Sequence, residues 1–444
     1  MGILSAASPL QRHNYNNYTY NIFHRYSEEV IGVLGTNKGL PARGSAEYYS
    51  VQAASDQRRH RLKDSPAAIT FAGGDVTEMI ENLANLQYAL VYVGTPPVPF
   101  LVALDTGSAT FSLPCGCNDC ARSFQKSDGE QINLYSYNYS TSRTSEVVPC
   151  GSPYCFPPRR EDCPLRAPNT YPCPYEVVYM AKNTSTRGIL VKDVMHLETY
   201  DDNRTRSSAP VIFGCGQVET GDLLGEGPVN GLLGLGYGAL DVTSLLSSQG
   251  LVRNSFSMCF APNGYGRFAF GDLGDLDQMS TPFLPTFDQS PYYNIQIEHI
   301  SVENVVVNLS LVAFFDSGTT LTHLAGEAYS LVTKTFNLFV NDTLVPMAGP
   351  FEYCYISRTD NGTSIQTPSL SLRTKGGADF HVLTTTKLIK PQPFSGLGEQ
   401  IYCLGIIKND INNLNIIGRN FMTGYRVVFD REKLILGWKS SYCK

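Results

Sequence analysis

Short apolar runs, separated by turn residues, dominate the polar–apolar pattern of the chain after about residue 80. Gln87 to Val93 and Phe100 to Leu104 are predicted to form neighbouring strands, because a Gly-Thr-Pro-Pro turn separates them. Tyr292 to Ile300 alternates apolar with polar residues, which is typical of a strand with one buried face. Further strands are expected over Val302 to Val307, Ile401 to Lys408 and Gly424 to Gly437.

Helical patterns are few. Asp241 to Gln249 is predicted to be a short helix, because Asp241 can cap its N-terminus and Gly250 can end it. Gly326 to Phe339 repeats apolar residues at helical spacing and is predicted to be an amphipathic helix. Many short strands and few helices indicate an all-β fold.

Two apolar runs end in the same kind of turn, Asp105-Thr106-Gly107-Ser108 and Asp316-Ser317-Gly318-Thr319. In each turn Gly permits a tight bend, and a small hydroxyl residue can bond the neighbouring carboxylate. Each turn is followed at a distance by an apolar run with glycine, Gly231 to Gly236 after the first and Asn415 to Gly418 after the second. The repeat predicts an internal duplication with one lobe and one carboxylate turn per copy.

Composition supports a globular β protein. The chain has 444 residues, 42% of them hydrophobic and 17% charged, which is ample for buried cores. The 39 Gly, 26 Pro, 26 Tyr and 22 Phe suit many strands joined by tight turns. A net charge of -6 argues against nucleic acid as a partner, since a nucleic-acid surface needs clustered Lys and Arg.

The 12 cysteines predict disulfides, with zinc as the competing interpretation. Zinc is disfavoured because the chain has only 7 His and no second Cys-x-x-Cys pair. Paired cysteines together with Asn-x-Ser/Thr sequons indicate an oxidising, secretory environment. Glycosylation is expected at Asn138, Asn203, Asn308, Asn341 and Asn361. Asn183 also forms a sequon, which we expect to be unused or to restrict the size of the substrate.

The N-terminal segment differs from the rest of the chain. Its first 20 residues lack the apolar stretch of a signal peptide, so we expect a truncated form of a secreted protein rather than one that never enters the secretory route. No membrane anchor can be seen in the sequence. Residues 1–80 contain few strand signals and a basic cluster, Arg58 to Lys63, and the alternatives are a disordered tail or a propeptide lying over an acidic cleft.

Several stretches besides the two turns resemble the pepsin-like aspartic proteases, specifically their plant nepenthesin-like branch. They are Cys173 to Tyr179, Phe213 to Gly216, Phe256 to Phe260 and Asn420 to Arg431. The resemblance implies a bilobal pepsin-like fold with the active site between two β-barrel-like lobes. It also implies a propeptide over residues 1–80, an N-terminal lobe over 81–274 with a Cys-rich insert over 115–173, and a C-terminal lobe over 275–444.

The resemblance further implies an aspartic endopeptidase that needs no cofactor and no metal. Asp105 and Asp316 would be the catalytic carboxylates, which share a proton and activate a water molecule. Catalytic support would come from the other residues of the two turns, Thr106, Gly107, Ser108, Ser317, Gly318 and Thr319. Tyr179 would be the flap residue over the substrate, in a hairpin formed by Tyr175 to Tyr179 and Gly188 to Leu197.

The resemblance also pairs Cys354 with Cys403 and Cys259 with Cys443, and leaves the order of the other eight cysteines open. The expected partners are peptide or protein substrates, and the expected state is a monomer. The alternative is a catalytically weak or inactive binding or inhibitor protein on the same fold. One departure bears on activity, because Ser112 stands where relatives have Trp.

Overall fold

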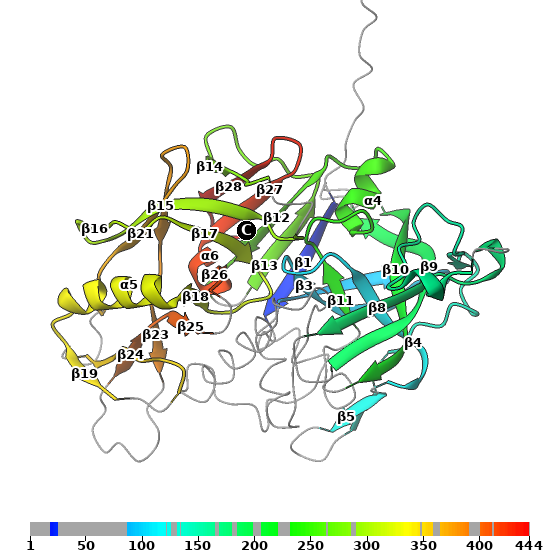
Figure 1. Ribbon diagram of the computed structural model, residues 1–444, viewed down its shortest axis with the longest axis horizontal. Helices are drawn as coiled ribbons and strands as arrows, with labels where there is room; N and C mark the ends of the chain where they lie inside the picture. The colour runs from blue at the N-terminus through cyan, green and yellow to red at the C-terminus, as the bar shows by residue number, and fades with distance from the viewer. Residues whose placement is uncertain are drawn as a thin grey trace, which may run out of the picture.

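The structure is a computed structural model that describes residues 18–24, 87–120, 122–125, 131–133, 135–164, 168–179, 184–198, 206–220, 231–262, 265–285, 290–346, 349–357, 365–389, 400–410 and 413–443. Strands make up most of the described secondary structure, which confirms the all-β prediction. Figure 1 shows one group of strands on each side of the molecule and a set of long strands between them. Among the described residues, no helix is long and apolar enough to cross a membrane.

One side of the molecule is built around the hairpin of β2 (Gln87–Val93) and β3 (Val98–Asp105). Most side chains of β2, among them Val91 and Val93, are fully buried, whereas Tyr92 is exposed, so the strand lies largely within the core. The other strands on this side are β4 (Phe111–Asp119), β7 (Glu146–Val147), β8 (Pro174–Tyr179), β9 (Thr184–Glu198), β10 (Arg206–Thr220) and β11 (Leu232–Gly234). Smaller elements are β5 (Ser123–Gln125), β6 (Gln131–Asn133), the 3-10 turns η1 (Arg160–Asp162) and η2 (Pro168–Thr170), and helix α4 (Val242–Ser248).

A continuous 14-stranded sheet joins this side to the end of the chain. From one edge the sheet runs β14 (Met279–Pro282), β28 (Ile435–Ser440), β27 (Tyr425–Asp430), β12 (Ser255–Phe260), β13 (Tyr265–Phe270) and β1 (Tyr18–His24), followed by β2 and β3 (Figure 1). The residues 18–24 therefore form a strand, although the sequence pattern there gave few strand signals. A stack of Phe256 on Phe429, with ring centroids 4.6 Å apart, packs strands from distant parts of the chain against each other.

The other side contains an 8-stranded sheet and a 4-stranded sheet. The first consists of β15 (Asn294–Val302), β16 (Val305–Val307), β17 (Leu311–Asp316), β18 (Thr322–Ala325), β21 (Leu370–Thr374), β22 (Asp379–Val382), β25 (Ile406–Asn409) and β26 (Asn415–Gly418). The second consists of β19 (Thr343–Val345), β20 (Cys354–Ile356), β23 (Thr386–Ile389) and β24 (Ile401–Leu404). Helices α5 (Gly326–Leu338) and α6 (Arg419–Met422) belong to the same part of the chain.

Two predicted strands are broken in the structure. The run from Ile401 to Lys408 divides at Gly405 into β24 and β25, because β24 pairs with β23 in the 4-stranded sheet and β25 pairs with β18 in the 8-stranded sheet. The run from Gly424 to Gly437 is a hairpin, with a turn between β27 and β28. Asp430 makes that turn, since its Oδ1 accepts the backbone N–H groups of Glu432 and Lys433.

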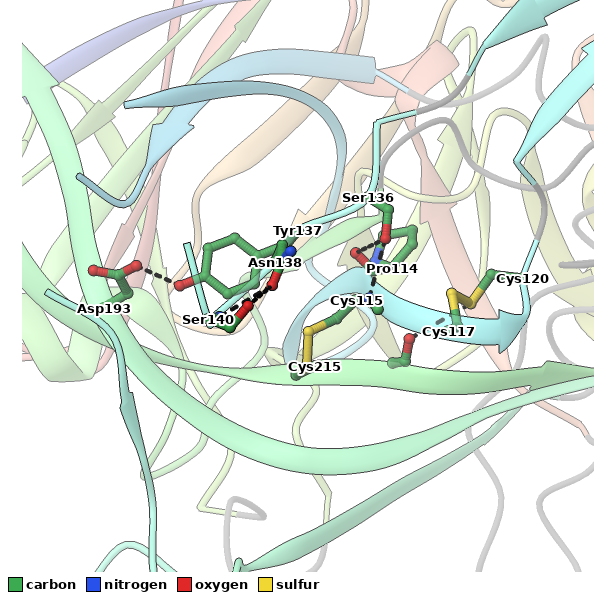
Figure 2. Close-up of a disulfide and its surroundings, with 12 residues drawn as sticks. Pro114, Cys115, Cys117, Cys120, Ser136, Tyr137, Asn138, Ser140, Asp193 and Cys215 are labelled. Carbon is green, nitrogen blue, oxygen red and sulfur yellow. Dashed lines mark hydrogen bonds between the residues drawn. A yellow bond between two sulfur atoms is a disulfide. The ribbon is translucent and has the colours of Figure 1, made fainter. Parts of the chain in front are cut away.

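All twelve cysteines form disulfides. Cys259 is bonded to Cys443 and Cys354 to Cys403, which are the two pairs that the resemblance implies. The pairs that the sequence left open are Cys115–Cys215, Cys117–Cys120, Cys150–Cys163 and Cys155–Cys173. Figure 2 shows the first two beside Tyr137, whose hydroxyl donates to the buried carboxylate of Asp193. The insert is thus fastened to β10 by a covalent bond and anchored to β9 by a buried hydrogen bond.

Candidate active site

Asp105 ends β3 and is held by its own turn. The Gly107 backbone N–H donates to its Oδ1 at 2.9 Å, and the Ser108 hydroxyl donates to its Oδ2 at 2.8 Å. The side chain is almost fully buried. Both bonds fix the plane of the carboxylate, because each oxygen accepts from a donor within the same short turn.

Asp316 ends β17 in the same way. The Gly318 N–H donates to its Oδ1 at 2.9 Å, and the Thr319 hydroxyl donates to its Oδ2 at 2.6 Å. Asp316 is also buried. The two turns are therefore equivalent in hydrogen bonding as well as in sequence, which matches the predicted duplication.

Thr106 and Ser317 tie the two turns together. The Thr106 N–H donates to the Ser317 hydroxyl at 3.1 Å, and the Ser317 N–H donates to the Thr106 hydroxyl at 2.9 Å. Each hydroxyl also donates to a carbonyl of the opposite chain segment, Thr106 to Phe315 and Ser317 to Leu104. This reciprocal set of bonds holds the two halves of the molecule in register at the point where the aspartates meet.

The two carboxylates face a common volume. A Cβ placed on Gly107 would lie 3.1 Å from Asp105 Oδ1 and 3.2 Å from both carboxylate oxygens of Asp316. One point is therefore within hydrogen-bonding distance of both acids, and the lack of a side chain on Gly107 leaves it open. Two carboxylates that share such a volume can hold a water molecule and a proton between them.

A strand beside each turn completes the arrangement. Gly234 of β11 pairs in parallel with Asp105, and Gly418 of β26 pairs in parallel with Asp316. Both glycines are required by close backbone contacts, because a Cβ would lie 2.4 Å from the Thr110 nitrogen at Gly234 and 2.4 Å from the Leu321 oxygen at Gly418. The two apolar runs with glycine that follow the turns in the sequence thus contain the strands that flank the turns in the structure.

The predicted flap is the β8–β9 hairpin, in which Tyr179 pairs with Thr184. The side chain of Tyr179 and the tip residue Asn183 lie outside the described residues. The contacts of Tyr175 were not predicted: its hydroxyl is 2.8 Å from Thr186 Oγ1, and its ring packs on Gly214. The signal that could have indicated this contact is Gly214 itself, because a glycine within a strand often marks a place where another group approaches closely.

The remaining predicted sites are placed as follows. Ser112 is buried on β4, opposite Gly214 of β10. Asn138, Asn308 and Asn341 are exposed, whereas Asn203 and Asn361 lie outside the described residues. The sulfur atoms of Cys150, Cys155 and Cys163 lie within 4.8 Å of one another, but each is consumed in a disulfide.

Paired carboxylate turns between two β-halves define the class of the pepsin-like fold, and the comparisons agree. A family model described as Xylanase inhibitor N-terminal matches residues 88–272, and one described as Xylanase inhibitor C-terminal matches residues 292–440. The chain belongs to the pepsin-like aspartic protease family, in its plant nepenthesin-like branch.

Curated relatives cover nearly the whole chain. Aspartyl protease family protein 1 of Arabidopsis thaliana is 42% identical over 97% of this chain and 82% of that protein. Aspartic proteinase-like protein 1 of the same plant is 36% identical over 96% of this chain and 81% of that protein. Among solved structures, basic 7S globulin from soybean is similar with a TM-score of 0.63 and 16% identity, covering 96% of this chain and 97% of that one, which supports the fold.

Proposed function

We propose that this protein is an aspartic endopeptidase that cleaves peptide bonds at acidic pH. The observation that supports it best is the common volume between Asp105 and Asp316, each of which is oriented by a backbone N–H and a hydroxyl. The names of the curated relatives point to the same activity. Extended peptides or proteins are the proposed substrates, and no cofactor is required by this chemistry.

The proposed mechanism uses one proton shared by the two acids. Two like charges in a buried volume repel each other, so the pair keeps one proton at acidic pH. The ionised carboxylate accepts a proton from the bound water as the water oxygen attacks the scissile carbonyl carbon, and the protonated carboxyl donates to the carbonyl oxygen. The diol then collapses: the carboxyl that took the water proton donates it to the leaving nitrogen, the other carboxylate accepts the proton of a diol hydroxyl, and the C–N bond breaks, so that the pair again holds one proton.

We also propose that the protein is made as a secreted or vacuolar zymogen that acts as a monomer, with residues 81–274 and 275–444 as its two lobes. Six disulfides are consistent with an oxidising compartment. The strand β1, within the proposed propeptide, pairs with β13 and β2 in the central sheet. Removal of the propeptide would therefore require either that β1 leaves the sheet or that the chain is cleaved after β1 while β1 stays paired.

The decisive test is cleavage of an acid-denatured protein between about pH 3 and pH 5, where a carboxylate pair can hold one proton. Asp105→Asn and Asp316→Asn should each abolish cleavage, because neither variant can hold both roles of acid and base. Asp277→Asn, which changes an exposed aspartate in the same fold, should leave cleavage unchanged. If Asp105→Asn and Asp316→Asn both cleaved the substrate as fast as the natural protein, the mechanism would be refuted.

A binding or inhibitor protein is the second candidate, because the two matching family models are described as those of xylanase inhibitors. That function predicts no cleavage by the natural protein and dose-dependent inhibition of a xylanase that survives Asp105→Asn. Running both assays on the same preparations separates the two functions.

A further inference from the structure

The segment that follows β11, Leu235 and Gly236, supports the backbone of the turn that carries Asp105. After β11, the Leu235 backbone N–H donates to the Asp105 carbonyl at 2.8 Å, and the Gly236 N–H donates to the Ser108 carbonyl at 2.7 Å. Leu235 and Gly236 therefore bracket the whole first carboxylate turn from its first residue to its last. Any shift of this segment moves the backbone on which Asp105 is mounted.

Two side chains donate hydrogen bonds to the Leu235 carbonyl. The Tyr293 hydroxyl donates to it at 2.7 Å, and Arg431 Nη2 donates to it at 2.8 Å. Tyr293 precedes β15, and Arg431 lies in the turn between β27 and β28, so both come from the second half of the sequence. The carbonyl of one residue beside the first aspartate is thus a meeting point of three distant segments.

Arg431 is itself held rigidly. Its Nη1 donates to both carboxylate oxygens of Asp241, at 2.8 and 2.9 Å, and the side chains of this pair are fully buried. Asp241 is the N-cap of α4, and its Oδ1 also accepts the Ser244 N–H. The guanidinium carbon lies 5.4 to 5.5 Å from the ring centroids of Tyr237, Phe256 and Tyr293.

The charge of this cluster is stable under working conditions. Burial acts to lower the pKa of Arg431, but the Asp241 carboxylate outweighs it and raises that pKa. Burial raises the pKa of the Tyr293 phenol, which keeps its proton for the Leu235 carbonyl. An arginine suits this place because its planar fork can serve Asp241 and the Leu235 carbonyl at the same time.

We propose that Tyr293 and Arg431 are positioning residues that act through the Leu235 carbonyl to set the place of the Asp105 carboxylate relative to Asp316. This inference rests on the proposed peptidase function for its kinetic consequence, but its structural consequence can be measured without activity. The cluster connects the β27–β28 hairpin to Asp105, so a displacement of that hairpin would also displace the Asp105 carboxylate.

Tyr293→Phe is the mildest test, because it removes one hydroxyl and keeps the buried ring. Its matched control is Tyr425→Phe, since Tyr425 is also buried and donates at 2.7 Å to a backbone carbonyl, that of His381. Both variants should lose similar stability. We expect Tyr293→Phe to lower kcat about two- to twelve-fold with KM little changed, the effect of one lost hydrogen bond, and Tyr425→Phe to leave kcat unchanged.

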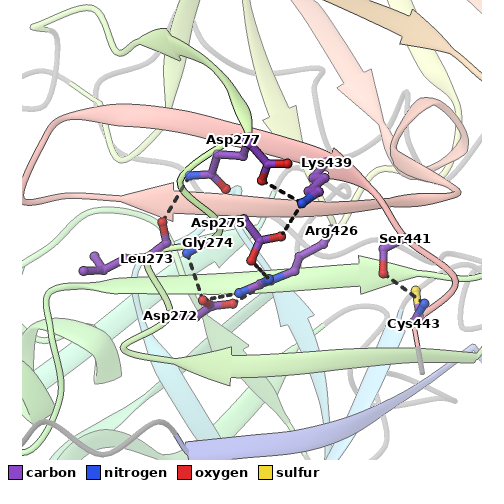
Figure 3. Close-up of polar contacts among 10 residues, drawn as sticks. Asp272, Leu273, Gly274, Asp275, Asp277, Arg426, Lys439, Ser441 and Cys443 are labelled. Atoms are coloured by element: carbon purple, nitrogen blue, oxygen red, sulfur yellow. Dashed lines mark hydrogen bonds and ion pairs between the residues drawn. The ribbon is translucent and has the colours of Figure 1, made fainter.

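Arg431→Lys tests the fork, since a lysine keeps the charge beside Asp241 but cannot serve both acceptors. Arg426→Lys is its control, because Arg426 lies on the same hairpin and binds Asp272 and Asp275 (Figure 3), neither of which belongs to a carboxylate turn. Arg431→Lys should lower kcat at least as much as Tyr293→Phe, and Arg426→Lys should lower stability alone. Equal kcat in the two lysine variants, with both folded, would overturn the proposal.

Amide hydrogen exchange provides the readout that needs no activity. In Tyr293→Phe the Leu235 and Gly236 amides should exchange about two- to twelve-fold faster than in the natural protein, and in Tyr425→Phe they should not. Unchanged exchange in Tyr293→Phe would contradict the positioning role even if the enzyme were active. Faster exchange in a protein without cleavage activity would keep the positioning role and reject the peptidase function.

Discussion

A single hydroxyl, three residues after each aspartate, orients each carboxylate of the site. Ser108 does this for Asp105 at 2.8 Å and Thr319 does it for Asp316 at 2.6 Å. Because the two turns are equivalent, serine and threonine should be interchangeable at either place. The hydroxyl itself should not be dispensable, since its partner is a buried carboxylate.

Ser108→Ala should therefore lower kcat/KM by roughly ten- to a hundred-fold, the range expected for a hydrogen bond to a charged group. Ser108→Thr, which introduces the residue of the second turn, should retain most of the activity. Steady-state kinetics on one peptide substrate compares the two. An alanine variant as active as the threonine variant would mean that the Gly107 N–H alone orients the acid.

At the scale of elements, the strands beside the turns depend on glycine. A Cβ on Gly418 would lie 2.4 Å from the Leu321 oxygen and 3.0 Å from the Thr319 oxygen, so Gly418→Ala should destabilise the fold by about 1 to 3 kcal/mol or more. Gly326 at the start of α5 has its nearest neighbour at 4.0 Å. Gly326→Ala should stabilise by about 0.4 to 1 kcal/mol, and urea unfolding of both variants measures the contrast.

The loop after β13 is joined to β27 by charge. Burial acts to raise the pKa of Asp272, but hydrogen bonds from Arg426 and Ser257 outweigh it and hold that pKa below its ordinary value of 3.8 (Figure 3). A carboxyl whose pKa is lowered by folding stabilises the fold fully at a pH above its pKa in the unfolded state. This contribution is lost as the pH falls through its pKa in the folded state.

Asp272→Asn should accordingly lower Tm clearly at pH 6, and the difference from the natural protein should shrink as the pH falls below about 3.8. Asp277→Asn, at an exposed aspartate of the same cluster, should leave Tm nearly unchanged at either pH. Thermal unfolding at a series of pH values gives both curves. A Tm difference that stays constant down to pH 2 would show that Asp272 acts through packing and not through its charge.

How much the sequence could predict depends on how local the signal is. The strand over Gln87 to Val93 and the helix capped by Asp241 were predicted because a turn or a cap marks their ends, and the structure confirms both. The break at Gly405 was missed because the chain changes there from one sheet to another, and the two partner strands β23 and β18 are distant in sequence. The carboxylate turns were visible as a repeat, whereas the grip of Arg431 on Leu235 depends on folding and leaves no pattern.

For the molecule as a whole, the disulfides differ widely in the length of chain that they close. Cys259–Cys443 spans 184 residues, whereas Cys117–Cys120 spans 3. On a chain-entropy estimate the long bond stabilises by ~5 kcal/mol and the short one by ~2 kcal/mol. Replacing Cys259 and Cys443 by serine should thus lower the free energy of unfolding, measured with urea, far more than replacing Cys117 and Cys120 by serine. Equal losses would show that the short bond instead stabilises the insert around it.

The pairing of β27 with β12 has a consequence for synthesis on the ribosome. β12 emerges long before β27, and at about 5 to 20 residues per second the interval is roughly 10 to 30 s. During that time one edge of β12 has no β27 to cover it, although all six of its residues are buried in the finished protein. The nascent chain therefore exposes an uncovered edge of β12 until β27 has been made, and the central sheet cannot be completed before then.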